Sequence, residues 1–187
     1  MPGPYDLRYD AHYAPQIPRF MGAMGDPRVV NAVVAMSNVN EARLSRTPAP
    51  RSGVVRKLLI YVGTQSGNID VGVYDTASPR AKLASTGSMT CPAAGWREVS
   101  VTAFAVQQGV SYEMALACDN TTATFGHFNG AQATALPTGW WPTPGGAAPK
   151  PNPRILTSFP LPATMAEASL IQDSGRVFII GALVESA

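Results

Sequence analysis

Side chains able to do acid–base or nucleophilic chemistry are few in this sequence, and their spacing matches no catalytic motif. The two histidines, His12 and His127, lie far apart, and His127 falls near the end of an expected strand. We expect a surface or strand-edge histidine there rather than a base. No Gly-x-Ser-x-Gly elbow occurs, and the glycine pair at 145–146 lacks the lysine and helix of a phosphate-binding loop. We therefore predict no catalytic residue and no enzymatic activity.

Carboxylates are the next candidates, because glycoside hydrolysis needs only two of them. Asp70 and Asp75 lie near opposite ends of one expected strand and on different faces, so we expect them to solvate the sheet surface and its turns. A calcium ion held by Asp75, Asp119 and backbone carbonyls stays open as an alternative, although no EF-hand spacing is present. We predict no metal site and no cofactor.

The two cysteines, Cys91 and Cys118, have neither CxxC spacing nor the spacing of a zinc site. Cys118 continues the alternation of Tyr112, Met114 and Leu116, which predicts a buried position on a strand. Free cysteine commonly behaves as a small buried apolar residue. Whether Cys91 and Cys118 form a disulfide stays open, because the sequence does not supply their geometry.

Trp140 and Trp141 stand together in a stretch rich in proline and glycine, residues 129–154. This composition predicts a long irregular loop. One interpretation is that the tryptophans cap the hydrophobic core. The other is that they form a contact platform for a protein or a glycan, because tryptophan combines a large apolar area with an N–H donor.

Residues 40–187 carry the pattern of an antiparallel β-sandwich. In the stretch 66–75, Ile69, Val71 and Val73 alternate with Asp70, Gly72 and Tyr74, which predicts a half-buried strand. Turns recur every eight to twelve residues, as expected of a sandwich. About eight strands are predicted, at 40–47, 54–62, 69–75, 82–88, 96–102, 110–118, 121–128 and 176–184. The stretch 54–62 suits a central strand, and the apolar last stretch should lie inside a sheet.

Residues 1–39 read as an extended N-terminal arm. Prolines up to Pro27 deny it a regular helix or central strand. Its apolar side chains are too many for a solvated tail, and we predict that they bind a neighbouring subunit; packing on their own domain is the alternative. These residues are Tyr5, Tyr9, Tyr13, Ile17 and Phe20. The stretch 29–36 is compatible with a strand or a helix, and the Asp26–Pro27 start favours a short helix.

Composition narrows the class of partner. Charged residues are only 14% of the chain, and the formal net charge is +2. No run of Lys and Arg exceeds two residues, which argues against nucleic acid. No apolar stretch reaches the length of a membrane span, and the first residues lack the pattern of a secretory signal, so we expect no membrane partner and synthesis in the cytoplasm. Low charge suits a protein packed into an assembly.

Four segments give the sequence a resemblance to a group of tailed-bacteriophage structural proteins with a jelly-roll or carbohydrate-binding-like β-sandwich. The segments are 66–75 (SGNIDVGVYD), 83–88 (LASTGS), 109–124 (GVSYEMALACDNTTAT) and 158–164 (SFPLPAT). The resemblance covers 58–125 most closely and 40–187 loosely. It implies a virion component and supplies no catalytic residues. The arm is not part of the pattern.

We therefore expect a non-enzymatic virion structural protein, either a head-decoration or minor capsid protein or a tail-associated one. It would be made in the host cytoplasm and attached to the particle through its arm and loops. Its partners would be other capsid or tail proteins and further copies of itself as a homo-oligomer. The alternative is a module that binds a carbohydrate or a host receptor. This alternative predicts that Trp96, Trp140 or Trp141 is exposed beside polar side chains.

Overall fold

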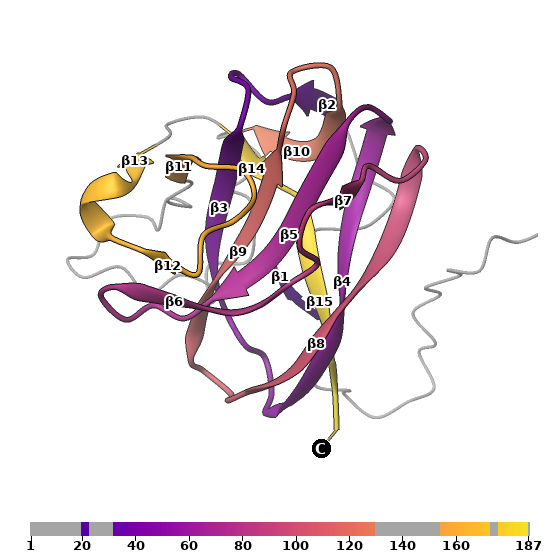
Figure 1. Cartoon of the computed structure of the whole chain (residues 1–187). Coiled ribbons are helices and arrows are strands. Elements are labelled where there is room, and N and C mark those ends of the chain that lie inside the picture. The colour runs from indigo at the N-terminus through magenta and orange to yellow at the C-terminus, as the bar shows by residue number, and fades with distance from the viewer. Residues whose placement is uncertain (1–19, 23–31, 130–153, 173–175, 187) are drawn as a thin grey trace, which may run out of the picture.

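The computed structural model describes residues 20–22, 32–129, 154–172 and 176–186 (Figure 1). Within these residues the chain is almost entirely β, and all strand pairs are antiparallel. Two sheets pack as the layers of a sandwich, which confirms the predicted fold class. No helix in the described part is long and apolar enough to cross a membrane.

The first sheet has seven strands. Its main order is β1 (Phe20–Gly22), β15 (Ile180–Glu185), β4 (Gly53–Thr64), β10 (Thr124–Asn129) and β14 (Arg176–Phe178). In addition, β2 (Ala32–Ala35) pairs with β10, and β8 (Gly95–Val106) pairs with β4 along almost its whole length. The predicted stretch 54–62 is therefore a central strand, with β8 on one edge and β15 on the other.

The second sheet has eight strands. Its order is β12 (Thr164–Met165), β6 (Arg80–Ser85), β5 (Asn68–Tyr74), β9 (Ser111–Cys118), β3 (Glu41–Pro48), β11 (Arg154–Thr157) and β13 (Ile171–Gln172), with β7 (Met89–Thr90) on β5. A 3-10 turn, η2 (Glu167–Ser169), lies between β12 and β13. Across both sheets, eight of the described strands have six residues or more, which matches the predicted number; the others are shorter.

The main core lies between the two sheets and follows the period-two pattern of the sequence. Leu58, Ile60 and Val62 of the first sheet are buried there, and so are Ile69, Val71 and Val73 of the second. Each buried side chain of this size contributes roughly 1.5–3 kcal/mol through the hydrophobic effect. Cys91 and Cys118 belong to the same core, and both are free thiols, so the predicted burial of Cys118 is confirmed.

Two local predictions need correction. The helix predicted within 29–36 is wrong for its described part, because residues 32–35 form β2, paired residue by residue with β10. Val33 and Val34 have branched side chains that favour an extended backbone, and β10 supplies a free edge. The last predicted strand is also divided: β14 pairs with β10, and β15 lies between β1 and β4.

Candidate functional surfaces

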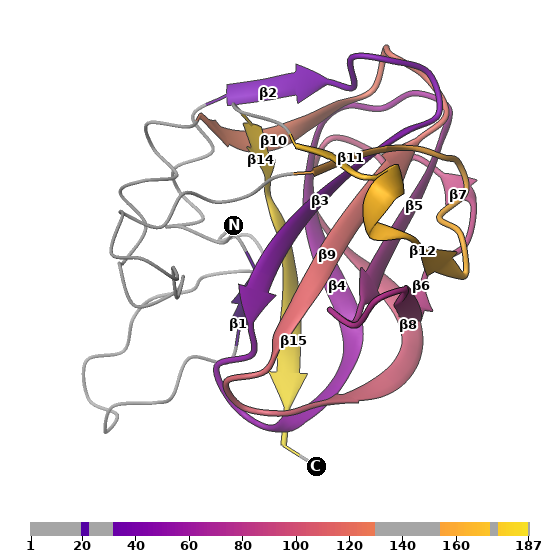
Figure 2. The ribbon, with the colours of Figure 1, turned by 90° about the vertical axis from the view of Figure 1, so that its left-hand side faces the viewer.

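The outer face of the second sheet is covered by a later part of the same chain, residues 158–171, which we call the strap (Figure 2). Its β12 pairs with β6, joining Thr164 to Ala81. Leu161 and Met165 of the strap are buried against Tyr74 and form a second, smaller core cluster with apolar residues of β3, β9 and β11. This cover explains why β5 is buried on both faces, whereas the alternation of its residues predicted a half-buried strand.

Polar contacts fix the strap at Leu161 and Pro162. The Leu161 N–H donates to Asp70 Oδ2 at 3.0 Å, and Lys82 Nζ donates to the Leu161 carbonyl at 2.7 Å. The Tyr74 hydroxyl donates to the Pro162 carbonyl at 2.6 Å. Asp70 is 0% exposed, so the prediction that it solvates the sheet surface is wrong. Burial raises the pKa of Asp70, against the hydrogen bond from Leu161 and the positive charge of Lys82.

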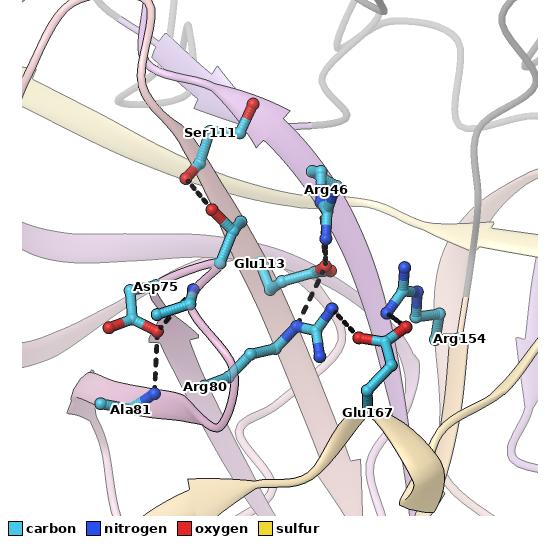
Figure 3. A network of polar contacts seen from close by, with 10 residues as sticks. Arg46, Asp75, Arg80, Ala81, Ser111, Glu113, Arg154 and Glu167 are labelled. Carbon is cyan, nitrogen blue, oxygen red and sulfur yellow. Dashed lines mark hydrogen bonds and ion pairs between the residues drawn. The ribbon is translucent and has the colours of Figure 1, made fainter. Parts of the chain in front are cut away.

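A chain of charged side chains crosses the same face (Figure 3). Glu113 of β9 is 0% exposed and accepts hydrogen bonds from Arg46 Nη2 at 2.9 Å and Nε at 3.1 Å. Arg80 of β6 approaches the same Glu113 oxygen at 3.4 Å and pairs with Glu167 of the strap. Glu167 also pairs with Arg154 of β11. The hydrogen bond from Arg80 and the charge of Arg154 lower the pKa of Glu167, although partial burial opposes this.

Asp75 and Asp119 cap turns at opposite ends of β5. Asp75 Oδ1 accepts the Ala81 N–H at 2.8 Å, and Asp119 Oδ1 accepts the Asn68 N–H at 2.9 Å. Burial opposes ionisation of Asp119, but hydrogen bonds from Asn68 and Asn120 lower its pKa overall. A strand of seven residues separates the two carboxylates, so the structure does not bring them together as ligands of one calcium ion. Within the described ranges no group of three or more His, Cys, Asp or Glu could hold a metal.

Buried polar groups were also missed at His127 and on the inward face of β3. His127 was expected at a surface or strand edge, but it is buried, with its ring 6.4 Å from that of Phe178. Across the core, the Arg43 guanidinium lies 5.9 Å from the Phe178 ring and pairs with Glu41. Glu41 and Arg43 stand two residues apart on one face of β3, and that spacing was the available signal.

The outward residues of β4 and β8 form a different surface, which we call the open face: Lys57, Leu59, Tyr61, Trp96, Glu98 and Ser100. The rings of Tyr61 and Trp96 are cross-strand partners in edge-to-face contact, with centroids 5.5 Å apart. Lys57 Nζ pairs with Glu98 Oε2 at 2.8 Å, and these side chains are 48% and 30% exposed. Trp96 is partly exposed, two residues before Glu98 on the same face of β8.

Most of the predicted binding residues lie outside the part of the chain that the structure describes. These are Tyr5, Tyr9, Tyr13 and Ile17 of the arm and Trp140 and Trp141 of the 129–154 stretch. Phe20 is the exception, because its backbone belongs to β1 and pairs with Leu183. Its neighbour Met21 is fully buried in the main core.

Comparison with known proteins assigns no family to the chain. No family model matches it, and no curated protein is significantly similar in sequence. A crystal structure of the cysteine protease and lectin-like domains of Cwp84, a surface layer associated protein of Clostridium difficile, resembles it with 11% identity and a TM-score of 0.44. The match covers 79% of this chain and 32% of that one.

Proposed function

We propose that this chain is a non-enzymatic structural protein of a tailed-bacteriophage virion, attached to the particle by residues 1–19, the part of the predicted arm that precedes β1. The resemblance of segments 66–75, 83–88, 109–124 and 158–164 to such proteins motivates the proposal. The position on the head or the tail stays open within it. Its partners are other virion proteins and further copies of the same chain.

The observation that carries the proposal is the way the arm joins the sandwich. Strand β1 forms the edge of the first sheet and pairs with β15 from Phe20 to Gly22. Met21 in this strand is buried in the main core. The nineteen residues before β1 would span up to about 63–68 Å if extended, so they could reach a neighbouring subunit while β1 stays in its own sheet.

The acidic side chains support a structural role rather than a catalytic one. Each of the eight within the described ranges has a contact that serves the fold: Glu41 with Arg43, Asp70 with Leu161, Asp75 with Ala81, Glu98 with Lys57, Glu113 with Arg46 and Arg80, Asp119 with Asn68, Glu167 with Arg80 and Arg154, and Glu185 with Arg56. Glycoside hydrolysis would need two carboxylates free to act as an acid and a base or nucleophile, whereas these eight are engaged in contacts within the fold.

The test is incorporation of the chain into phage particles. Particles purified on a density gradient should contain the full-length chain at constant stoichiometry, measured by mass spectrometry. A variant that lacks residues 1–19 keeps β1, so it should unfold at the same temperature as the full chain and fail to enter particles. Absence of the full-length chain from the particles would refute the virion role.

The matched control is a change at β1 itself. Met21→Ser keeps the whole arm but buries a hydroxyl in the main core, so it should lower stability by about 2–5 kcal/mol. Comparing it with the truncation separates loss of the arm from loss of the fold. Normal incorporation of the truncated chain would refute attachment through the arm and leave the virion role standing.

A further inference from the structure

We infer that the open face is a binding site for a neutral saccharide, with Tyr61 and Trp96 as the apolar platform and the Lys57–Glu98 pair as the polar contact. This inference goes beyond the proposed structural role, and it concerns the isolated chain. It starts from the sheet register. Tyr61 on β4 stands opposite Trp96 on β8, and Leu59 stands opposite Glu98 one step along the face.

The aromatic pair stands on the outside of the sheet. The neighbours of Tyr61 in sequence, Ile60 and Val62, are buried in the main core, so the Tyr61 ring points away from it. Trp96 has the same parity as Glu98, opposite to that of the buried Val99. Both rings stay partly exposed. Partly exposed aromatic rings offer apolar area at a wet surface, which suits the C–H face of a pyranose ring.

The rings are held in place before any ligand arrives. The interplanar angle of 79° is that of an edge-to-face contact, which aromatic pairs prefer. Leu59, which lies between Lys57 and Tyr61 on the same face of β4, is only 8% exposed. A platform that is already ordered loses little side-chain entropy on binding.

The charges around the platform favour a neutral ligand. Lys57 and Glu98 form one ion pair of opposite sign. Arg56 and Glu185, on β4 and β15 of the same sheet, form another with 2.8 Å between the charged atoms. The two pairs carry no net charge between them, and the nearby Arg97 donates to the carbonyls of Ala93 and Ala94. These side chains therefore form no cluster of cations of the kind that attracts a polyanion such as nucleic acid. An exposed ammonium and carboxylate supply donors and acceptors for hydroxyl groups, which fix the orientation of a sugar.

The experiment uses tryptophan fluorescence of the full chain. Trp96, Trp140 and Trp141 are its three tryptophans, so a Trp140→Phe/Trp141→Phe variant reports on Trp96 alone. It is titrated with maltohexaose, cellohexaose and N-acetylchitohexaose as neutral probes and with dextran sulfate as an anionic probe. We expect a saturable change in the fluorescence of Trp96 with at least one neutral probe at about millimolar concentration. Binding of dextran sulfate alone would overturn the inference.

Three substitutions in this background assign the effect to the open face. Tyr61→Ala should weaken binding at least about tenfold, and Glu98→Gln should weaken it several-fold. Glu185→Gln removes a carboxylate of the other ion pair and should leave binding unchanged. Circular dichroism establishes that each variant is folded. Equal affinity of Tyr61→Ala and the parent variant would overturn the inference, because the signal would then come from elsewhere.

Two further outcomes would also overturn the inference. One is a flat titration with every neutral probe up to about 10 mM. The other is self-association, measured by analytical ultracentrifugation, that Tyr61→Ala abolishes; the open face would then be an interface between copies of this chain. Because every measurement uses the isolated chain, failure of saccharide binding leaves the proposed virion role intact, and failure of particle incorporation leaves the saccharide site intact.

Discussion

The two outer faces of the sandwich use charge in opposite ways. On the strap-covered face, Glu113 is 0% exposed and Arg80 is 3% exposed, and besides each other they pair with residues of two other segments, Arg46 of β3 and Glu167 of the strap. On the open face, Lys57 pairs with Glu98, and both side chains are in contact with solvent. Both faces belong to antiparallel sheets with the same inward apolar pattern. The difference comes from the strap, which one sheet has and the open face lacks among the described residues.

The buried ion pairs under the strap therefore belong to the fold, and the exposed pair leaves the open face available for binding. Removing a charged pair from water costs several kcal/mol per ion, so a buried pair is weak evidence of added stability. The buried network does have directional contacts, and we infer that it fixes where the strap lies on β6 and β9. Exposed pairs add little to stability. The open face can therefore change its side chains with little effect on folding.

The largest expected effect is the loss of Glu113. Glu113→Ala leaves Arg80 with a buried charge and one partner fewer, which should lower the free energy of unfolding by about 3–5 kcal/mol. The matched change on the open face, Glu98→Ala, should cost about 0–1 kcal/mol. Urea denaturation of the three proteins measures both values. Equal losses would break the distinction between the faces.

The main core lies between the two faces, so the pH dependence of its Cys118 thiol gives a stability effect that depends on neither face. Burial raises the pKa of Cys118 from its ordinary value of 9.0 to about 11. The unfolded chain therefore loses the thiol proton first, so this stability is present below pH 9 and is lost as the pH rises toward 11. The loss from Cys118 should be about 2–3 kcal/mol. The temperature of thermal unfolding should fall less steeply between pH 8 and about pH 11 for Cys118→Ala than for the native chain. An equal fall in both chains would contradict this assignment.

A matched pair of tyrosines tests the faces through a single hydroxyl. Tyr74→Phe leaves the Pro162 carbonyl without its donor under the strap, which should cost about 1–2 kcal/mol. Tyr61→Phe on the open face keeps the ring that contacts Trp96, and stability should change by less than about 0.5 kcal/mol. Chemical denaturation of both variants compares them. A larger loss for Tyr61→Phe would reverse the comparison.

The smallest expected effect is the loss of stability when acid protonates Glu167, which lies at the exposed edge of the strap-covered face. Ion pairs with Arg80 and Arg154 lower the pKa of Glu167 below its ordinary value of 4.5. This stability is present above pH 4.5 and is lost as the pH falls through the lower folded value, by about 0.2–1 kcal/mol for an exposed pair. Asp70 has a raised pKa, so its contribution to stability changes with pH in the opposite direction. Comparing the pH dependence of stability in the native chain and in Glu167→Gln therefore isolates the contribution of Glu167. Hydrogen exchange at pH 7 and about pH 3 measures the protection of the strap amides in the native chain and in Glu167→Gln. An equal loss of protection in both chains would refute the effect.

The sequence predicted most of the sandwich because the core residues recur with period two over short stretches. The strand 54–62 and the strand that includes Cys118 were found in this way, and the structure gives them as β4 and β9. The helix predicted within 29–36 was wrong at residues 32–35, because the prediction gave the proline start more weight than the branched valines. Pairing with β10, which the local sequence does not show, decides the structure there. The alternation of apolar residues predicts a strand reliably where the neighbouring strands in the sheet show the same alternation.

The burial of charged residues could not be predicted from local pattern. Asp70 and Glu113 alternate with apolar residues, as outward polar residues of a half-exposed sheet do. Asp70 is buried because residues 158–171, distant in sequence, lie over it. Glu113 is buried beside Arg46 and Arg80, and Arg80 in turn pairs with Glu167 of the strap. Trp96 was recognised as a candidate, but its partner Tyr61 was missed, because the β4–β8 register that joins them does not follow from either strand alone. The arm and the Trp140–Trp141 predictions stay predictions.

The difference between a covered and an open face is tested most directly by amine labelling of two lysines. Lys82 donates to the Leu161 carbonyl under the strap, and Lys57 lies on the open face with nearly half of its side chain exposed. The native chain is treated briefly with an acetylating reagent, and mass spectrometry measures the extent of labelling at each lysine. We expect Lys57 to be acetylated several times faster than Lys82 in the folded chain and at the same rate in urea. Equal rates in the folded chain would contradict this expectation.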